Sequence, residues 1–415
     1  MTSSSNRPAN PIDVEDVRTR VNAALAAFMD GQSALLGKIS PQLVPAADAL
    51  RDFLLDGGKR LRPAFCYWGW RAAGGAAGGE GIANAAAALE LLQASALVHD
   101  DLMDRSDTRR GLPSVHRRFE ALHRDSGWRG DREQYGASAA VLLGDLLLIW
   151  CDELFLRSGL DPAAVLAAKP VFDLMRTEVM LGQYLDVLEP VAGDSADEGA
   201  LERARTVLHY KSAKYTIERP LQVGALLAGA GPELVEALGA FGLPLGEAFQ
   251  LRDDLLGVFG DPAVTGKPAG DDLREGKRTL LVAHAMRSLP QADARHLDAR
   301  LGAPDLAAEE VAELRGLVAR SGAPELVEQR IEELMGQSLA ALAAARGSSA
   351  AVMARTTTIR RAPAASTSST VPRSIPPIAN HGRSVACFAA YETRPRPGAG
   401  RPGFVGVGQT GPVQK

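Results

Sequence analysis

The sequence predicts an all-α protein, and three observations support this fold class. Hydrophobic residues make up 46% of the 415 residues, and most of them are Ala and Leu, which have high helix propensity. Aromatic residues, which favour strands, make up only 5%. Apolar residues recur at helical spacing along most of the chain, and no segment alternates apolar and polar residues clearly enough to indicate a strand.

Composition also limits the class of protein. Arg, Asp or Glu interrupts every apolar stretch before it reaches 18 residues, so we expect no membrane span. The N-terminal sequence MTSSSNRPANPIDVED has no apolar core and is unlike a signal peptide. The three cysteines, Cys66, Cys151 and Cys387, are too few and too scattered for a zinc site or a disulfide framework. These features fit a reducing cytoplasm.

The first predicted helix follows a short disordered segment. Residues 1–11 are polar and lack apolar periodicity, so we expect them to be disordered. From Asp13 onward, Val14, Val17 and Val21 recur on one face of an amphipathic helix with an acidic first turn. This helix is expected to pack against the core.

A basic turn comes next, in the stretch LLDGGKRLRP (54–63). Two glycines precede Lys59, Arg60 and Arg62, and Pro63 begins another helix. Basic groups on a turn that leads into a helix N-terminus suit a phosphate-binding site, although an ordinary surface turn has the same composition. After that helix, GGAAGGEG (74–81) is expected to form a flexible loop.

The helix predicted from about Ile82 to Asp104 ends in an aspartate cluster, VHDDLMD, after the apolar run LELLQASALVH. Asp100 and Asp104 lie one turn apart and point only about 40° apart, so both carboxylates can reach one ion. Oxygen ligands without cysteine favour Mg²⁺ over zinc. The alternative is a solvated pair of acids at a helix end. Arg109 and Arg110 follow closely.

The middle of the chain is predicted to be helical after an irregular stretch. Residues 117–134 are polar, and we expect a loop or short helices there. Helical patterns then cover residues 136–155 and 162–188. Within the second of these, Gln183 and Asp186 form an i, i+3 polar pair on an apolar surface. They either face a common cavity or form an ordinary buried hydrogen bond.

A second aspartate cluster, Asp253 and Asp254 in FQLRDDLLGVFGD, also follows an apolar run. Carboxylates at the end of an apolar segment need a cation to remain ionised. Upstream, HYKSAKYTIERP places Lys211 and Ser212 before a proline. Downstream, residues 261–281 are rich in Gly and Pro and predict a loop that closes over phosphates. Helical patterns continue to about Arg346.

The composition changes abruptly at the end of this helical region. Residues 347–415 are rich in Ser, Thr, Pro, Gly and Arg and lack apolar periodicity, so we expect a disordered tail. Nine Lys or Arg and one acid give the tail about +8, which leaves about −12 on the preceding residues. The tail has no RNA-binding motif, and we do not expect it to bind nucleic acid. It is either a basic extension or an aberrant terminus.

Five motifs in order, GGKRLRP, LVHDDLMD with RRG close behind, KSA, FQLRDDLLGVFGD, and TGK with EGK, resemble those of the trans-isoprenyl diphosphate synthases, or polyprenyl synthetases. The resemblance, which is to the geranylgeranyl type of actinobacteria, runs from about residue 15 to 345. It implies the isoprenoid synthase fold, a single helical bundle around a central substrate cavity over residues 12–346. It also implies a homodimer and the head-to-tail condensation of an allylic diphosphate with isopentenyl diphosphate.

The resemblance further implies a role for each motif. Isopentenyl diphosphate would be bound by Lys59, Arg62, Gln93 and Arg110. The allylic diphosphate would be bound by Arg109, Lys211, Ser212, Gln250, Lys267 and Lys277, of which Lys211, Ser212 and Gln250 would also act in catalysis. Up to three Mg²⁺ ions, or Mn²⁺, would be held by Asp100, Asp101, Asp104, Asp253 and Asp254. The released diphosphate would take the proton, so no protein base is expected.

Three positions depart from the family pattern. Gln93 stands where many relatives have His, so a neutral donor replaces the imidazole. Ser212 stands where Thr is usual, which keeps the hydroxyl. Gly257 stands where relatives often have a fifth-position Asp. The second cluster is therefore expected to have only two carboxylates and to bind its ion less tightly.

Small residues below the first cluster predict the product length. In this family, bulky aromatics four and five positions before the first aspartate end the channel early and give a C15 product. Those positions here are Ala96 and Ser95, and the next large side chain is Leu92. We therefore expect a C20 product, geranylgeranyl diphosphate. The alternatives are another chain length, a class I terpene cyclase, or a non-catalytic subunit of a heteromeric synthase.

Overall fold

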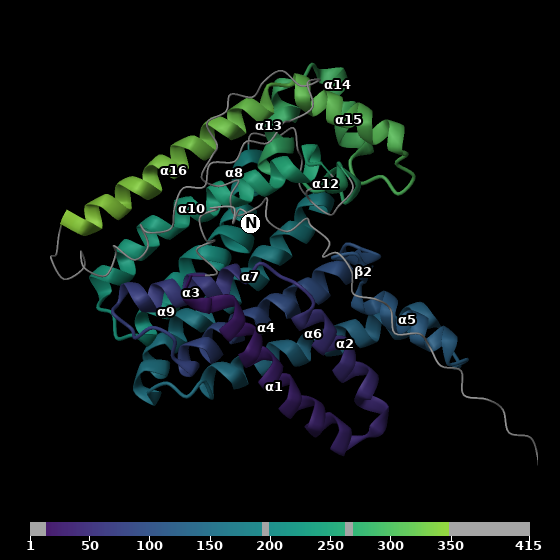
Figure 1. The fold of residues 1–415 in the computed structure, drawn as a ribbon. Helices are drawn as coiled ribbons and strands as arrows, with labels where there is room; N and C mark the ends of the chain where they lie inside the picture. Colours follow the sequence, from purple (N-terminus) through teal and green to yellow (C-terminus); the bar gives the residue numbers. More distant parts are fainter. Residues whose placement is uncertain (1–13, 193–198, 262–268, 348–415) are drawn as a thin grey trace, which may run out of the picture.

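The structure is a computed structural model that describes residues 14–192, 199–261 and 269–347, and it is almost entirely helical (Figure 1). In the N-terminal half, two short 3₁₀ turns (Val14–Asp16 and Pro41–Leu43) accompany α1 (Val17–Ile39), α2 (Val44–Leu55), α3 (Leu61–Ala72), α4 (Glu80–Met103), α5 (Val115–Asp125), α6 (Arg132–Leu156) and α7 (Pro162–Ala192). The C-terminal half contains α8 (Ala200–Val207), a π-helical segment (Leu208–Glu218), α9 (Arg219–Leu227), α10 (Pro232–Phe259), α12 (Asp271–Arg274), α13 (Leu280–Ser288), α14 (Gln291–Arg300), α15 (Ala308–Arg320) and α16 (Ala323–Gly347).

The helices form two packed groups. Figure 1 shows α1, α2, α4 and α6 in the lower part of the molecule, and α10, α13, α15 and α16 in the upper part. Each group has its own large apolar core, which contains Leu89 and Phe155 in the lower group and Leu281 and Leu317 in the upper group. The predicted all-α fold class is therefore confirmed.

Helix α4 is the central helix of the lower group. Leu89, Leu91 and Leu92 point in different directions around the helix, yet all three are fully buried. A helix that is apolar on every side is typical of a protein core. Among the described residues, α4 is also the one helix that is long and apolar enough to cross a membrane, although the sequence had predicted no such helix. Its most apolar window is 72% buried inside the protein, as expected of a core helix.

The stretch predicted to be irregular contains most of α5 and the start of α6. Val115 and Phe119 lie one turn apart and are buried, so α5 packs through an apolar face that its polar residues conceal in the sequence. Helix α6 begins four residues before the predicted start. Its N-cap, Asp131, accepts hydrogen bonds from the backbone N–H groups of Glu133 and Gln134 at 2.8 and 3.1 Å.

A two-residue hairpin follows α4, where no strand was predicted. Strands β1 (Thr108–Arg109) and β2 (Leu112–Pro113) pair antiparallel, and Arg110 and Gly111 form the turn with φ of 55° and 78°. Two positive φ values are typical of the type I′ turn, which matches the twist of paired strands. Arg109 therefore lies on β1 and Arg110 lies in the turn. Strand pairing holds the backbone of Arg109, and the turn conformation holds that of Arg110.

Several predictions concern parts of the chain outside the described residues. They are the disorder of residues 1–11, the nature of the tail from residue 348 onward, and the role of Lys267. These stay predictions.

Candidate active site

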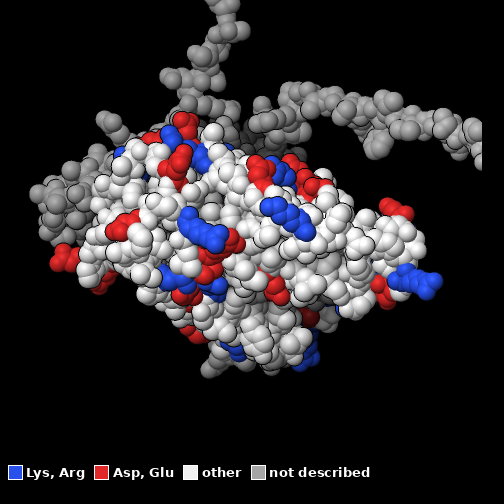
Figure 2. Space-filling model, turned by 90° about the horizontal axis from the view of Figure 1, so that it is seen from below, with Lys and Arg blue, Asp and Glu red and all other residues white. Residues whose placement is uncertain are grey.

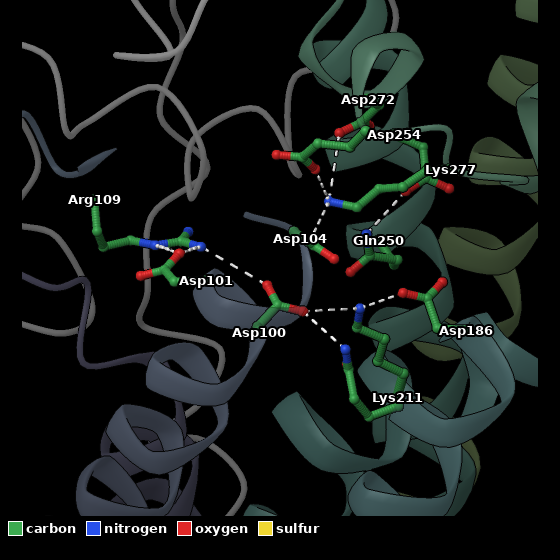
Figure 3. A network of polar contacts seen from close by, with 12 residues as sticks. Asp100, Asp101, Asp104, Arg109, Asp186, Lys211, Gln250, Asp254, Asp272 and Lys277 are labelled. Carbon is green, nitrogen blue, oxygen red and sulfur yellow. Dashed lines mark hydrogen bonds and ion pairs between the residues drawn. The ribbon is translucent and has the colours of Figure 1, made fainter. Parts of the chain in front are cut away.

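The first aspartate cluster lies at the C-terminal end of α4, and Figure 3 shows its three carboxylates in different surroundings. Asp100 Oδ1 accepts hydrogen bonds from Gln183 Nε2 at 2.9 Å and Lys211 Nζ at 3.4 Å. Asp104 Oδ2 lies 3.9 Å from Lys277 Nζ. Asp101 is fully buried and forms an ion pair with Arg109. Asp100 and Asp104 thus face the cations of the C-terminal half, as their one-turn spacing predicts.

Asp101 was predicted as a metal ligand, but the structure turns its side chain away from that group. Consecutive residues on a helix point about 100° apart, so Asp101 cannot share the direction of Asp100 and Asp104. Its Oδ1 accepts a hydrogen bond from Arg109 Nε at 2.9 Å. Arg109 Nη2 is also 3.7 Å from Asp100 Oδ2. Asp101 therefore anchors Arg109 beside the cluster.

The π-helical segment Leu208–Glu218 supplies the lysine of the KSA motif. Lys211 Nζ donates a hydrogen bond to Asp186 Oδ2 at 2.6 Å, in addition to its contact with Asp100 (Figure 3). The backbone of α7 approaches this segment closely, because a Cβ on Gly182 would lie 2.4 Å from Lys211 N. Ser212 follows in the same segment and is partly exposed. π-Helical turns occur often at functional sites, and the sequence pattern had not revealed this one.

The polar pair on α7, Gln183 and Asp186, was expected either to face a common cavity or to form an ordinary buried hydrogen bond. In the structure both side chains face this site. Gln183 contacts Asp100, and Asp186 contacts Lys211. Both side chains therefore hold charged groups of the candidate site in place. Gln183 and Asp100 are more than 80 residues apart in the sequence.

The second cluster lies near the end of α10, and its two carboxylates also differ. Asp253 is exposed, whereas Asp254 is buried and accepts a hydrogen bond from Gln250 Nε2 at 2.8 Å. Burial raises the pKa of Asp254 well above its ordinary value, and the nearby Asp272 and Asp253 add to this effect. Asp253 is therefore the carboxylate of this pair that is open to an incoming cation, while Asp254 orients Gln250.

Gly257 does not leave the second cluster with two carboxylates, as the sequence had suggested. A Cβ at this position would lie 1.9 Å from Asp272 Oδ2, so the Asp272 carboxylate occupies the space beside the glycine. Figure 3 shows Asp272 next to Asp254. The third carboxylate thus comes from α12, 15 positions along the chain from Gly257. No local pattern predicts it, because Gly257 and Asp272 lie on different helices, α10 and α12.

Lys277 lies between the two clusters. Its Nζ is 3.9 Å from Asp104 and 3.8 Å from Asp272, and it forms a further ion pair with Glu275. Burial disfavours its charge, but the surrounding carboxylates outweigh burial and raise the pKa of Lys277 well above its ordinary value. The ammonium group therefore stays charged in the site.

The carboxylates of the first cluster are electrostatically unequal. Burial opposes the ionisation of Asp100, yet Lys211, Lys277 and Arg109 outweigh it and lower the pKa of that carboxyl. Burial and the charge of Asp100 raise the pKa of Asp104 to about 7. A cation bound beside Asp104 would offset both effects and favour its ionised form.

Asp104→Asn is expected to stabilise the protein in Mg²⁺-free buffer. The folded-state pKa of about 7 exceeds the ordinary value of 3.8, so folding stability falls as the pH rises from about 4 to 7 and stays reduced above 7. The amide removes this penalty, and we expect the melting temperature at pH 8 to rise by about 2 °C or more, for about 1 kcal/mol. Thermal unfolding monitored by circular dichroism at pH 4.5 and pH 8 measures the effect.

The gain from Asp104→Asn should shrink at pH 4.5, where the wild-type carboxyl is protonated. Asp48→Asn is the matched control, because Asp48 is exposed on α2, outside both aspartate clusters, and its amide should leave the melting temperature unchanged. A lower melting temperature for Asp104→Asn than for the wild type at pH 8 would contradict the electrostatic account.

The basic turn before α3 joins the π-helical segment through Arg62. Arg62 Nη2 donates a hydrogen bond to Thr216 Oγ1 at 2.8 Å, and its guanidinium carbon lies 4.1 Å from the centre of the Tyr215 ring. Tyr215 in turn donates from its hydroxyl to Gln93 Oε1 at 2.9 Å. Because the amide oxygen accepts this bond, the amide nitrogen of Gln93 is its donating end. Tyr215, which the sequence analysis missed, thus connects two predicted ligands.

Arg110 approaches the same turn from the hairpin. Its Nη1 donates a hydrogen bond to the Asp56 carbonyl at 3.3 Å. Its Cδ also lies close to Gly57, because a Cβ added to that glycine would be 3.6 Å from it. Lys59 is partly exposed in the turn. The structure therefore brings Lys59 and Arg110 to one turn, and Arg62 extends from that turn toward Gln93.

The three predicted chain-length residues are not equally placed. Ala96 is partly exposed, whereas Ser95 and Leu92 are fully buried. Leu89, one turn below Leu92, is also fully buried. Of the three, Ala96 is the one that is not fully enclosed, while Leu92 belongs to the packed core beneath it.

The acidic groups fit Mg²⁺ by their chemistry. Among the described residues, no three carboxylate, imidazole or thiol groups converge as a complete metal site. Mg²⁺ does not require one, since it is commonly bound by one or two carboxylates together with water and substrate phosphates. The donors here are oxygens only, and burial together with the charge of Asp100 raises the pKa of Asp104, an effect that a cation bound beside it would offset. Asp100 and Asp104 on α4 and Asp253 on α10 would hold the ion.

Comparisons with known proteins agree with this geometry. The family model described as polyprenyl synthetase matches residues 45–318. A geranylfarnesyl diphosphate synthase from Aeropyrum pernix is 36% identical over 236 residues, which are 56% of this chain and 67% of that protein. A (2E,6E)-farnesyl diphosphate synthase from Mycobacterium bovis is 37% identical over 225 residues, which are 54% of this chain and 56% of that protein.

A solved structure covers more of the chain. The crystal structure of geranylgeranyl pyrophosphate synthase from Corynebacterium glutamicum, complexed with isoprenyl diphosphate and magnesium, is 41% identical with a TM-score of 0.77. The match covers 84% of this chain and 99% of that one. Since the family model spans well over half of the residues, the chain belongs to the polyprenyl synthetase family, and its enzyme class is that of the trans-prenyl diphosphate synthases.

Proposed function

We propose that this protein condenses an allylic diphosphate head to tail with isopentenyl diphosphate in a Mg²⁺-dependent reaction, with geranylgeranyl diphosphate as the product. The observation that carries the proposal is that α4 and the π-helical segment each contribute to two polar sites. Asp100 of α4 meets Lys211 at one site, and Gln93 of α4 meets Tyr215 beside Arg62 at the other. Two diphosphates would thus be held on the same pair of elements.

The acidic site suits the ionisation of the allylic substrate. Bound Mg²⁺ would supply positive charge that stabilises the departing diphosphate. Asp100, Asp104 and Asp253 would hold the metal, while the charged Lys211 and Lys277 would neutralise diphosphate oxygens. These cations are already oriented by Asp186, Asp100 and Glu275, so little reorganisation accompanies the reaction.

The basic turn suits the second substrate. Lys59, Arg62 and Arg110 would bind the diphosphate of isopentenyl diphosphate, and the donating amide of Gln93 would add a neutral contact. Holding both substrates on α4 and the π-helical segment converts the attack of the isopentenyl double bond into a reaction between positioned groups. The Ser212 hydroxyl and the Gln250 amide oxygen would shield the allylic cation by their dipoles. The released diphosphate would then take the proton.

The C20 product rests on Ala96. The related proteins named above are farnesyl, geranylgeranyl and geranylfarnesyl diphosphate synthases, so they support the reaction without selecting a length. The small, partly exposed Ala96 leaves room below the first cluster, and the buried Leu92 and Leu89 lie beneath it. This arrangement supports a channel that extends beyond a C15 chain and ends before much longer ones.

Incubation of the purified protein with labelled isopentenyl diphosphate, an allylic primer and Mg²⁺ tests the proposal. We expect linear chain elongation with a C20 product on chromatography. A cyclic hydrocarbon would instead identify a class I terpene cyclase. Absence of any product at saturating substrate and Mg²⁺ would identify a non-catalytic subunit, and either result would overturn the proposal.

We also propose a homodimer, because α6 and α7 each carry large apolar side chains that are exposed. Leu142 and Ile149 on α6 are exposed and seven residues apart, and Leu174 and Leu181 on α7 repeat the same spacing. Residues seven apart lie on one helix face, so each pair of side chains projects from one side of its helix. Exposed apolar surface of this kind is typical of a subunit interface. A second copy of the chain would cover it.

Leu142→Arg combined with Leu181→Arg is expected to produce a monomer of 43.8 kDa where the wild type has twice that mass. Two buried, unpaired guanidinium groups in a symmetric interface cannot be compensated. Light scattering after size-exclusion chromatography measures the mass. Leu339→Arg is the matched control, because Leu339 is equally exposed but lies on α16. A monomeric wild type, or an unchanged double variant, would contradict the dimer.

We propose a cytoplasmic location and no nucleic-acid partner. The apolar α4 is mostly buried, and Cys66 and Cys151 are buried free thiols, as in a reducing compartment. On the face shown in Figure 2, Lys and Arg are interspersed with Asp and Glu, so the described residues there offer no continuous basic surface. This charge distribution supports small anionic substrates in a defined site over binding to a polyanion.

A further inference from the structure

The basic turn contains a third cation, Arg60, whose surroundings differ from those of Lys59 and Arg62. The Arg60 side chain is only 2% exposed, and its backbone has a φ of 53° at the N-cap of α3. A non-glycine residue in the left-handed region is strained and persists only where its surroundings hold it. The sequence grouped the three cations together, but Arg60 points into the protein.

The guanidinium of Arg60 joins three helices. Its Nε donates to Asn22 Oδ1 of α1 at 2.9 Å, its Nη2 donates to the Leu54 carbonyl of α2 at 2.5 Å, and its Nη1 donates to Glu90 Oε1 of α4 at 2.6 Å. Glu90 is itself buried. An ion pair this deeply buried is costly to form and strongly directional, so it fixes the position of the groups that form it.

The turn lies directly on this ion pair. A Cβ on Gly58 would lie 2.8 Å from Arg60 Nη1, 3.3 Å from Glu90 Oε1 and 3.2 Å from Arg110 Nη2. The Gly58 backbone is therefore enclosed between the ion pair and Arg110, in a conformation (φ of 102°) that favours glycine. Lys59 is the next residue, and Arg62 lies in the first turn of α3. The spacing of these cations depends on where the ion pair holds the turn.

We propose that Arg60, through its buried ion pair with Glu90, is a positioning residue that sets the geometry of the isopentenyl diphosphate site formed by Lys59, Arg62 and Arg110. This inference rests on the proposed function. Arg60 does not touch the substrate, because its donors are engaged with α1, α2 and α4. Glu90 and Gln93 are three residues apart on α4. Helix α4 therefore fixes the position of the basic turn relative to Gln93.

Arg60→Lys tests the proposal, because lysine keeps the charge but cannot contact α1, α2 and α4 together. We expect the KM for isopentenyl diphosphate to rise at least about tenfold, which is the scale of one lost charge-assisted hydrogen bond. The kcat and the KM for the allylic diphosphate should change less than about twofold, because the acidic site is untouched. Calorimetric titration of isopentenyl diphosphate in the presence of a non-ionisable allylic analogue should show the same loss of affinity.

Arg176→Lys is the matched control. Arg176 forms an ion pair with Asp152 between α7 and α6, at 2.7 Å, and belongs neither to the basic turn nor to the ion pair beneath it. It should leave the KM for isopentenyl diphosphate unchanged even if it lowers the melting temperature. The proposal is overturned if Arg60→Lys resembles this control, or if all kinetic parameters fall together in proportion to the folded fraction.

Asn22→Ser provides a milder variant if Arg60→Lys does not fold. This substitution keeps the Arg60–Glu90 ion pair but replaces the side chain that accepts from Arg60 Nε by a shorter one. We expect a selective rise of about twofold or more in the KM for isopentenyl diphosphate. An unchanged KM in a folded Asn22→Ser variant counts against the proposal. Failure of the proposed function is distinct from either result, since the wild type would then bind no isopentenyl diphosphate in the titration and elongate no primer.

Discussion

Asp100→Ala and Asp253→Ala are each expected to lower kcat by at least about 10³-fold while the helical fold remains intact. Asp100 is the carboxylate with a lowered pKa, held ionised by Lys211, Lys277 and Arg109, and Asp253 is the exposed carboxylate on the opposite helix. Both are thus available to a metal ion, and neither belongs to the apolar core. Steady-state turnover at saturating Mg²⁺, with circular dichroism on the same samples, measures the two expectations together.

Asp125→Ala is the control for this pair, because Asp125 is an exposed helix-terminal aspartate paired with Arg124 at the far end of α5. Its turnover should equal that of the wild type. Asp101→Ala provides a contrast of another kind. It removes a buried ion pair with Arg109, so we expect lower thermal stability as well as lower activity. Condensation at wild-type rates in Asp100→Ala or Asp253→Ala would remove the metal-binding premise.

Ala96→Phe is expected to shift the product from C20 to C15 or shorter. Ala96 lies one turn below Asp100, about 6 Å along the helix, and it is partly exposed. A phenyl group there would fill the space that the growing chain enters, without changing the carboxylates above. The fully buried Leu92 and Leu89 lie about 12 and 16 Å below Asp100 and form the next large side chains on α4. Chromatography of the dephosphorylated products measures the length.

Ala340→Phe makes the same substitution on an exposed face of α16 and should leave the product unchanged. The rate of primer consumption by Ala96→Phe should stay near the wild-type value, because the channel is shortened below the reacting atoms. If this variant still makes the parental length, Ala96 does not line the channel and the argument for C20 loses its basis.

The helices themselves could be predicted where apolar periodicity was strong. Helix α4 and the long α7 were predicted within a few residues, because their propensity and apolar spacing agree locally. Helix α5 lies mostly in the stretch for which a loop or short helices were expected, because two buried apolar residues are few against the polar remainder of the segment. The hairpin was missed because two-residue strands carry no alternation.

The aspartates on one helix face were likewise predictable. The one-turn spacing of Asp100 and Asp104 follows from helix geometry. The same geometry separates Asp101 from them, although the family resemblance implied that Asp101 is a metal ligand. The identity of the family followed from the order of short motifs, each of which is contiguous in the chain. Local spacing therefore determined the fold class and the acidic groups at the centre of the site, and the ordered motifs carried the resemblance to the family.

The tertiary structure decided which of the remaining polar residues belong to the site. Asp272 fills the space beside Gly257, Tyr215 connects Arg62 to Gln93, and Arg60 turns inward to Glu90 although Lys59 and Arg62 flank it. The sequence by itself determined the helices and the motifs, because these depend on neighbours within one or two turns. The partners of Asp272, Tyr215 and Arg60 depend on the packing of helices from distant parts of the chain, and that packing is fixed only when the two apolar cores form.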